Sequence, residues 1–237
     1  MKLGVISDVH ANLPALEAVL DDMPEVDELV CLGDIVGYNP YPSECLDLVR
    51  GECDVVLQGN HDRDVEDPRQ YSRNEQAYKG LELALDELGS DDVEYLVELP
   101  EKTELAGGDV LAVHSHPRAT DQYVMPDDFP EVKKYLDGYD ALLLGHTHFQ
   151  HEERFNEGLV LNPGSVGQPR DGTSAAYAVI DTETMESELY RTSYDVWETV
   201  KKVGEKDLPT ETGERLLPDD VISMESKRSR YDRRRGP

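Results

Sequence analysis

Short runs of apolar and β-branched residues alternate with amphipathic stretches over the first sixty residues of the chain. Residues 2–7, 28–32 and 54–58 have the pattern of buried strands, whereas residues 13–20 and 42–50 space their apolar positions as helices do. Strands and helices that alternate at this spacing predict a parallel sheet with right-handed crossovers. We therefore expect an α/β fold, with the functional residues just beyond the carboxyl ends of the strands.

The second half of the chain is dominated by predicted strands. Helices are expected over residues 74–88 and 91–97, and a closing helix over residues 196–202. Six further strands are predicted over residues 109–113, 141–144, 150–155, 159–161, 175–180 and 187–191. The sequence contains no internal repeat. We expect one domain over residues 1–208, followed by a C-terminal extension over residues 209–237.

The charge balance of the chain is strongly acidic. Asp and Glu number 51 and Lys and Arg number 23 among 237 residues, which gives a net charge of −28. Such a chain is repelled by nucleic acids and anionic membranes, so an electrostatically driven binder of either is disfavoured. It also repels itself at low ionic strength. The composition resembles that of halophilic archaeal proteins and predicts a salt-adapted protein, with an ordinary acidic cytosolic protein as the alternative.

The C-terminal tail and the cysteines bear on partners and compartment. Residues 225–237 hold six basic and two acidic residues, which indicates a disordered, basic tail that touches the acidic body or, alternatively, a nucleic acid. The three cysteines have no paired spacing, so a disulfide scaffold or cysteine zinc site is not expected. No apolar run is long enough to form a membrane helix or a signal-peptide core. We expect a cytoplasmic protein, and nothing in the sequence indicates its oligomeric state.

Side chains that commonly bind metals stand at the ends of five predicted strands. In chain order these are Asp8 and His10, then Asp34, then Asn60 with His61 and Asp62, then His114, then His146 and His148. Residues i and i+2 of an extended segment face the same side, so each D-x-H or H-x-H pair can share one ion. A lone histidine of this kind is usually a satisfied core residue. Five blocks in order, each at a strand end, instead predict a metal centre.

In this order the blocks resemble the signature of the calcineurin-like metallophosphoesterase superfamily: D-x-H, G-D, G-N-H-D/E, a His and G-H-x-H. The resemblance covers about residues 1–205. The stretches SDVHANLPALEAVL, GDIVGYNPYP and NPGSVGQPRDG are most similar to small prokaryotic phosphoesterases related to symmetrical diadenosine tetraphosphatases. The resemblance implies a four-layer sandwich in which two mixed β-sheets are flanked by helices, with two metal ions at the strand ends.

Carried over by motif position, the resemblance implies two metal sites that share one carboxylate. The first would be bound by Asp8, His10, Asp34 and His148, and the second by Asp34, Asn60, His114 and His146. Nitrogen and oxygen ligands of this kind favour Mn²⁺ here, with Ni²⁺, Co²⁺, Fe or Zn²⁺ as alternatives. Two cations acidify a shared water, so the expected reaction is hydrolysis of a small phosphoester or nucleotide by a metal-bridging hydroxide.

Two residues of the G-N-H-D block are expected to serve catalysis rather than metal binding. The resemblance implies that His61 is not a ligand, and its place favours donation of a proton to the departing oxygen. Asp62 is the expected partner that orients the His61 ring. A helix cap or a buried hydrogen bond is the alternative for His61.

Several residues are candidates for substrate binding. Arg170 is expected to make a bidentate phosphate contact, unless it pairs with a surface carboxylate such as Asp171. The glycine-bearing turn over residues 162–167, with Asn162, Gly164 and Ser165, could meet phosphate oxygens through its backbone N–H groups. Tyr38 is expected either to border the leaving-group pocket or to form a turn.

The sequence departs from the family after His114, where Ser115, His116 and Pro117 stand in place of the common H-G-S-P pattern. His116 is expected at the rim, with a pocket role as the alternative. Other functions also remain open. A dinucleoside polyphosphate hydrolase is one, and a non-catalytic scaffold is another, although scaffolds of this fold tend to lose the histidine that His61 represents. A nuclease would need an extra DNA-binding domain.

Overall fold

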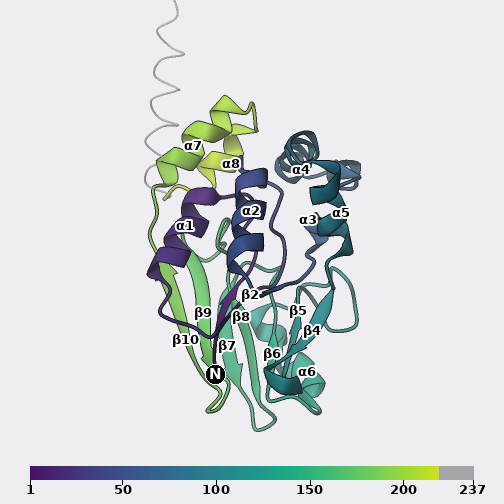
Figure 1. The fold of residues 1–237 in the computed structure, drawn as a ribbon, viewed down its shortest axis with the longest axis vertical. Helices are drawn as coiled ribbons and strands as arrows, with labels where there is room; N and C mark the ends of the chain where they lie inside the picture. Colours follow the sequence, from purple (N-terminus) through teal and green to yellow (C-terminus); the bar gives the residue numbers. More distant parts are fainter. Residues whose placement is uncertain (219–237) are drawn as a thin grey trace, which may run out of the picture.

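Two mixed five-stranded sheets stack on each other at the centre of the protein (Figure 1). The structure is a computed structural model and describes residues 1–218. The first sheet has the order β10-β9-β1-β2-β3, with β1 Lys2–Ile6, β2 Glu28–Cys31, β3 Val55–Val56, β9 Ala175–Asp181 and β10 Glu186–Thr192. The second has the order β4-β5-β6-β8-β7, with β4 Lys102–Leu105, β5 Val110–Val113, β6 Ala141–Leu143, β7 Gln150–Arg154 and β8 Leu159–Pro163.

Each sheet has a parallel centre and an antiparallel edge. Strands β1, β2 and β3 are parallel, and β9 joins β1 in the antiparallel direction. In the second sheet β5, β6 and β8 are parallel, while β4 and β7 run antiparallel to their neighbours. The parallel first half and the mixed-sheet fold class are therefore confirmed. The parallel strands deliver their carboxyl-end loops to a shared edge, where the site lies.

Strand alternation gives each sheet two apolar faces. Leu3 and Val5 point into the layer between the sheets, where they meet side chains such as Val110 and Ala112. The intervening Leu111 and Val113 point outward and pack with Phe129, which begins a short helix on that side. Because successive strand residues face opposite sides, such strands are buried on both faces. Helices must therefore cover the outer face of each sheet, which produces four layers.

Helices cover the first sheet more extensively than the second (Figure 1). The helices of residues 1–218 are α1 Leu13–Asp22, α2 Pro42–Glu52, α3 Asn60–Arg63, α4 Glu75–Glu87, α5 Ser90–Glu98, α6 Phe129–Val132, α7 Val196–Glu205 and α8 Thr210–Glu214. Short 3₁₀ turns are η1 Pro68–Tyr71, η2 Ala106–Gly108, η3 Pro126–Asp128 and η4 Lys133–Leu136. Buried residues of α1, α2, α4 and α5 share one core with Ile6 and Cys31 of the first sheet.

The predicted elements agree with these bounds to within a few residues, with two kinds of difference. Strand β3 is shorter than expected, because the N–H of Gln58 bonds to the carbonyl of Pro100 rather than continuing the ladder. Helices α3, α6 and α8 and strand β4 were not predicted. All are short, and their apolar positions are too few to show a period.

The C-terminal part of the described chain lies against the body. Helix α8 packs on α7, and Leu216 and Leu217 are buried. The predicted basic tail over residues 225–237 lies outside the described residues. None of the helices in residues 1–218 combines the length and the apolarity that a bilayer crossing requires.

Candidate metal centre

Loops that follow five strands meet at the carboxyl edge of the sheets. The N–H of Asp8 bonds to the carbonyl of Gly33 at 2.9 Å, and that of His10 bonds to the carbonyl of Asp34 at 2.9 Å. Across the sheets, the N–H of His146 donates to the Asp8 carboxylate at 3.0 Å. The structure thus brings together all seven residues predicted as metal ligands, and each is at most 8% exposed.

Two glycines allow the loops after β2 and β3 to approach each other. A Cβ on Gly33 would lie 2.4 Å from the nitrogen of Gly59, and one on Gly59 would lie 2.1 Å from a carboxylate oxygen of Asp34. Gly33 also has a φ of +102°, which L-residues rarely adopt. Only glycine at both positions therefore lets Asp34 reach the place where the loops meet.

The backbone of the site is strained. Five of the seven candidate ligands have positive φ angles between 46° and 68°: Asp8, His10, Asp34, His146 and His148. A non-glycine residue in this region costs on the order of 1–3 kcal/mol, and such residues cluster at functional sites. The surrounding hydrogen bonds must offset that cost to keep these side chains converging.

A first cluster is formed by Asp8, His10 and His148, whose donor atoms lie within 4.8 Å of one another. The Nε2 atoms of the two histidines are 3.1 Å apart, and His148 Nε2 is 3.2 Å from Asp8 Oδ1. Both rings direct Nδ1 toward a backbone carbonyl, at 3.1 Å for His10 and 2.6 Å for His148. This leaves the Nε2 lone pairs facing each other, an arrangement that an ion between them would stabilise.

A second cluster is formed by Asp34, His114 and His146, with Asn60 beside them. Nε2 of His114 lies 3.4 Å from Asp34 Oδ2 and 3.3 Å from Asn60 Oδ1. Its Nδ1 faces the carbonyl of Leu32 at 2.9 Å. Asp34 Oδ2 is also 3.6 Å from His10 Nε2, so this carboxylate lies between the two clusters.

Burial and mutual charge shift the pKa values of these groups in opposite directions. Burial lowers the pKa of His10 well below its usual range and that of His61 to about 4. Burial would raise the pKa of the Asp34 carboxyl, but the neighbouring His114 and His61 hold it well below its usual range. Burial would also lower the pKa of His114, yet the Asp34 carboxylate raises it to about 9. The Asp34 carboxyl therefore stays ionised, which is the state in which it can bind a cation.

The chemistry of these donors fits bound divalent cations. Asp8 Oδ1 is buried without a hydrogen-bond partner. An unpaired buried carboxylate oxygen costs free energy unless a cation or a donor reaches it. Imidazole, carboxylate and amide donors together suit Mn²⁺, Fe, Co²⁺, Ni²⁺ or Zn²⁺ better than an all-oxygen ion such as Mg²⁺.

His61 lies at the edge of both clusters. Its ring packs edge-on against His10, with centroids 4.8 Å apart, and beside Tyr38 at 4.9 Å. Its Nδ1 is buried without a hydrogen-bond partner. The ring is also close enough to His10 and Asp34 to count among potential metal donors. Its position therefore serves either the substrate or an ion, and a variant must separate the two.

Asp62 has a different role from the one expected. Its carboxylate accepts hydrogen bonds from the N–H groups of Asp34, Ile35, Val36 and Gly59, at 2.7 to 3.3 Å. These bonds tie the loop after β2 to the start of α3. The expectation that Asp62 orients the His61 ring is wrong, because its oxygens are occupied by backbone donors. Asp62 instead positions Asp34.

The glycine-bearing turn after β8 also has another task. Asn162 Nδ2 donates to the carbonyl of Gly145 at 2.7 Å, and Asn162 Oδ1 accepts from the N–H of Gly164. Ser165 Oγ donates to the carbonyl of Asp8 at 2.7 Å and accepts from the N–H of Gln168. The side chains of Asn162 and Ser165 therefore brace the ligand loops, and contact of phosphate oxygens with backbone N–H groups of this turn stays a prediction.

Arg170 and Tyr38 lie at the mouth of the site. Arg170 forms no ion pair within residues 1–218, since Asp171 pairs with Arg191 at 2.6 Å. Its guanidinium lies 5.9 Å from the ring centroid of Tyr123, and its Nε is buried without a partner. Tyr38 is 7% exposed and packs edge-on against His10. Arg170 is thus free to bind an anion beside the clusters.

A polar strap holds two of the second-cluster residues, and sequence reasoning missed it. Asn60 Nδ2 donates to the Tyr71 hydroxyl at 2.6 Å, and that hydroxyl donates to Asp64 at 3.2 Å. Arg63 bonds Asp64 with Nε and Nη2, and Asp121 with Nη1 and Nη2. The backbone carbonyl of Asp121 faces His146 Nε2 at 3.3 Å. Of the strap residues, only Arg63 and Asp64 are adjacent to a sequence motif. No motif near Tyr71 or Asp121 indicates that these two residues support the site.

The strap should control the affinity of the second cluster for metal. Tyr71→Phe removes the acceptor that orients Asn60, and Arg63→Gln releases the loop that carries Asp121. Loss of such outer partners typically weakens metal binding 10–100-fold. Calorimetric titration of Mn²⁺ into metal-stripped protein should show one of two binding events weakened by about that factor. Tyr78→Phe and Arg50→Gln are matched controls on α4 and α2 that should change neither event. Unchanged Mn²⁺ affinities in both strap variants would contradict this role.

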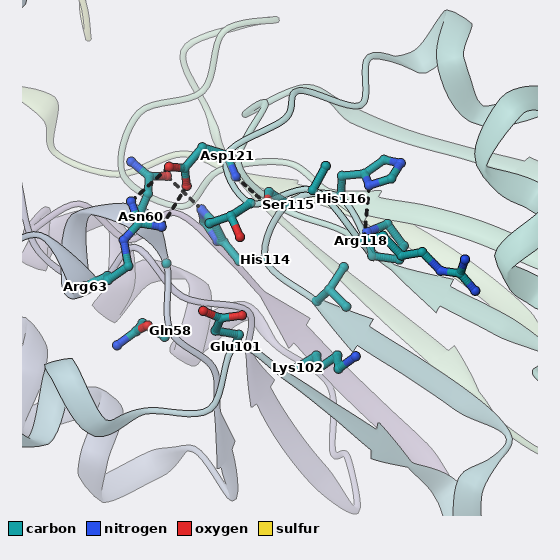
Figure 2. A pocket seen from close by; sticks show the side chains of 15 residues that line it. Gln58, Asn60, Arg63, Glu101, Lys102, His114, Ser115, His116, Arg118 and Asp121 are labelled. Atoms are coloured by element: carbon teal, nitrogen blue, oxygen red, sulfur yellow. Dashed lines mark hydrogen bonds and ion pairs between the residues drawn. The ribbon is translucent and has the colours of Figure 1, made fainter.

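A cavity of about 250 Å³ opens beside the second cluster (Figure 2). Its lining includes the candidate ligands Asn60 and His114, together with His116 and Arg118. Figure 2 shows Arg63 and Asp121 bonded at one side of the cavity and His116 beside Arg118 at the other. His116 therefore lines the cavity rather than only its rim.

Comparison with known proteins agrees with this geometry. The family model of the calcineurin-like phosphoesterase superfamily domain matches residues 1–185. The chain is 34% identical to the uncharacterized protein MJ0912 of Methanocaldococcus jannaschii, in an alignment that covers 91% of this chain and 97% of the relative. It is 27% identical to phosphodiesterase YfcE of Escherichia coli K12, over 78% of this chain and 90% of the relative.

A solved structure shows the same similarity in three dimensions. The metallophosphoesterase of Sphaerobacter thermophilus superposes with a TM-score of 0.78 at 30% sequence identity. The alignment covers 91% of this chain and 98% of that protein. The similarity in three dimensions therefore extends over most of the chain.

Proposed function

The chain belongs to the calcineurin-like phosphoesterase superfamily and is a metal-dependent phosphoesterase, and we propose that it uses a binuclear centre to hydrolyse a small phosphoester or nucleotide. The observation that supports this most strongly is the position of Asp34. Its Oδ2 lies 3.6 Å from His10 and 3.4 Å from His114, so one carboxylate can serve two ions. The similarity to phosphodiesterase YfcE favours phosphodiesters among the substrates.

The proposed ligands divide into two sets that share Asp34. Asp8, His10, Asp34 and His148 would hold one ion, and Asp34, Asn60, His114 and His146 would hold the other. When bound, the two cations activate water and neutralise charge on the phosphoryl oxygens. Mn²⁺ is the proposed native ion, because sites that contain several imidazole nitrogens favour first-row transition-metal ions over Mg²⁺.

The chain's own residues supply positioning and proton transfer. Arg170, free of ion pairs within the described chain, would anchor a phosphoryl oxygen with two parallel N–H groups. His61 would place a ring N–H at the departing oxygen, and Tyr38 would exclude water above His10 and His61. The loops that carry these groups are held in position by the side chains of Asp62, Asn162 and Ser165.

The sequence left two alternatives to this function. A dinucleoside polyphosphate hydrolase is favoured by the motif stretches after β1 and β2, and it would act on the same centre. A non-catalytic scaffold is disfavoured, because His61 and all seven proposed ligands are present and lie together.

A substrate panel before and after chelation tests the proposed function. We expect purified protein to hydrolyse bis-p-nitrophenyl phosphate and to lose that activity in a chelator. Added Mn²⁺, Co²⁺ or Ni²⁺ should restore it better than Mg²⁺. Diadenosine tetraphosphate, p-nitrophenyl phosphate and cyclic nucleotides in the same panel separate the substrate alternatives. Hydrolysis that survives verified metal removal, or no hydrolysis of any member with any ion, would contradict the proposal.

The acidity of the protein is a surface property, which supports the proposal of a salt-adapted cytoplasmic protein. Among the carboxylates of residues 1–218, only Asp8, Asp34, Asp62 and Asp64 are buried. The remaining acids face or partly face solvent and repel one another. Screening by concentrated salt reduces that repulsion, since the Debye length falls to about 3 Å at 1 M.

Salt should therefore stabilise the folded state. The thermal midpoint is expected to rise by about 10 °C between 0.1 M and 2 M KCl, because relief of a few kcal/mol shifts the midpoint about 2–4 °C per kcal/mol in a chain of this size. Sucrose at matched osmolality is the control, since it is excluded from the surface but screens no charge. An equal midpoint at both KCl concentrations would remove the salt-adaptation proposal.

A further inference from the structure

Three cations gather beside the metal centre in a protein dominated by acids. Lys102, Arg118 and Lys134 are exposed, and none forms an ion pair with a carboxylate of residues 1–218. The chain has 51 acidic and 23 basic residues, so free cations have many acids with which to pair. Neighbouring cations that stay unpaired on such a surface can bind an anion from outside the protein.

These cations line a hollow that continues from the metal centre. The cavity of about 250 Å³ is bordered by Asn60 and His114 at one end and by Lys102 and Arg118 at the other. A second hollow of about 640 Å³ shares Lys102, Pro117 and Arg118 with it and adds Lys134. Figure 2 shows Lys102 and Arg118 on the side of the cavity away from Asn60. The two hollows together exceed what a simple phosphate group would occupy.

Tyr135 holds two of the cations in place. The Arg118 guanidinium lies 5.3 Å from the ring centroid of Tyr135, and the Lys134 ammonium lies 5.1 Å from it. The His116 ring packs edge-on against Tyr135 with centroids 5.2 Å apart. Cation–π attraction offsets part of the repulsion between two neighbouring positive charges. The ring therefore keeps both charges together while leaving their N–H groups free.

The charge of the second hollow differs from that of the whole surface. Its lining contains Lys102, Arg118 and Lys134 against Glu104 and Asp137, and Glu104 already accepts a hydrogen bond from Tyr139. Three cations and two carboxylates make a locally positive lining, whereas the chain as a whole carries a net charge of −28. Arg63, the other arginine lining the 250 Å³ cavity, is committed to Asp64 and Asp121, and Glu101 adds one carboxylate to that cavity.

From this arrangement we infer that Lys102, Arg118 and Lys134 form a second anion subsite, which binds a phosphate on the distal part of the substrate. The inference rests on the proposed function and narrows it: the substrate is a phosphodiester whose distal end carries a further phosphate group. The scissile phosphorus lies at the metal centre and the distal phosphate lies among the three cations. Arg118 suits a phosphate because its planar fork matches two of the oxygens.

Matched dinucleotides test this subsite. The 5′-phosphorylated dinucleotide pTpT and its unphosphorylated form TpT differ only in the distal phosphate. We expect the Mn²⁺-loaded, full-length protein to favour pTpT over TpT by about tenfold in kcat/KM, an effect of one or two charge-assisted hydrogen bonds. In the double variant Arg118→Gln/Lys134→Gln, and in Lys102→Gln/Arg118→Gln, that ratio should fall to within about twofold.

The control variant removes a cation at the other end of the sheet. Lys2→Gln lies at the start of β1, opposite the carboxyl edge that carries the site, and should leave the ratio unchanged. Equal use of pTpT and TpT by wild type, or a preference that persists in both double variants, overturns the subsite. If wild type hydrolyses no phosphoester, the proposed function fails instead. In that case the affinities of the same proteins for pTpT and TpT are measured by calorimetry, and the ratio of the two affinities tests the subsite.

Discussion

Asp34→Asn is expected to reduce kcat/KM by about 10³-fold or more. One metal ion supplies several kcal/mol of transition-state stabilisation, and each 1.36 kcal/mol is a factor of ten in rate. Asp34 Oδ2 lies between His10 and His114, so loss of its charge weakens both sites at once. Asparagine has nearly the same shape, and its amide oxygen can still accept the N–H of His61, which Asp34 Oδ1 accepts at 2.8 Å. The loss therefore reports charge rather than collapse.

Metal content and folding separate the explanations for this variant. Elemental analysis should find fewer than two ions per chain in Asp34→Asn, while circular dichroism stays like that of wild type. Asp27→Asn is the matched control, because Asp27 accepts from the backbone of Lys2 at the opposite end of β1. It should keep both ions and full activity. Wild-type activity with two ions in Asp34→Asn would show that this carboxylate does not bridge.

His61→Gln is expected to leave both ions bound and to lower kcat by roughly 10²–10⁴-fold, the range for loss of a general acid. The ring is 3% exposed and packs against His10 and Tyr38 at the edge of the clusters. From there it can donate to the departing oxygen. The loss should be greatest for alkyl phosphoesters, whose leaving groups need a proton, and smaller for p-nitrophenyl esters.

A leaving-group series in wild type and variant measures this effect. The slope of log kcat against leaving-group pKa should be steeper in His61→Gln than in wild type. His151→Gln is a matched control, since His151 lies on β7 and packs against Phe129. Loss of a metal ion from His61→Gln would make His61 a ligand. An equal loss for every leaving group would make it a positioning residue.

Much of the fold could be predicted from local patterns, because its central strands are buried on both faces and its larger helices are amphipathic. Strands β1 and β5 are short apolar runs that end in potential ligands. Element α3 was not readable, because the four residues Asn60–Arg63 show no period. Their helical turn depends on Asp62, whose carboxylate accepts hydrogen bonds from the backbone N–H groups of Asp34 and Ile35.

The candidate ligands were predictable, whereas their supports were not. Motif spacing placed Asp8 and His148 at strand ends, and the structure brings them within 3.2 Å. Tyr71 and Asp121 act through partners that are 11 and 58 residues away, which no local pattern reveals. Asn162 was predicted to belong to a turn whose backbone N–H groups meet phosphate, but no local pattern indicated that its side chain donates to the carbonyl of Gly145.

The central claim is that one carboxylate, Asp34, holds two ions. Anomalous diffraction from a crystal of the Mn²⁺-saturated protein tests this most directly, because it locates each manganese without assuming a ligand. The account predicts two anomalous peaks per chain, one beside Asp8, His10 and His148 and one beside Asn60, His114 and His146, with the Asp34 carboxylate between them. A single peak at saturation, or peaks that do not contact Asp34, would contradict it.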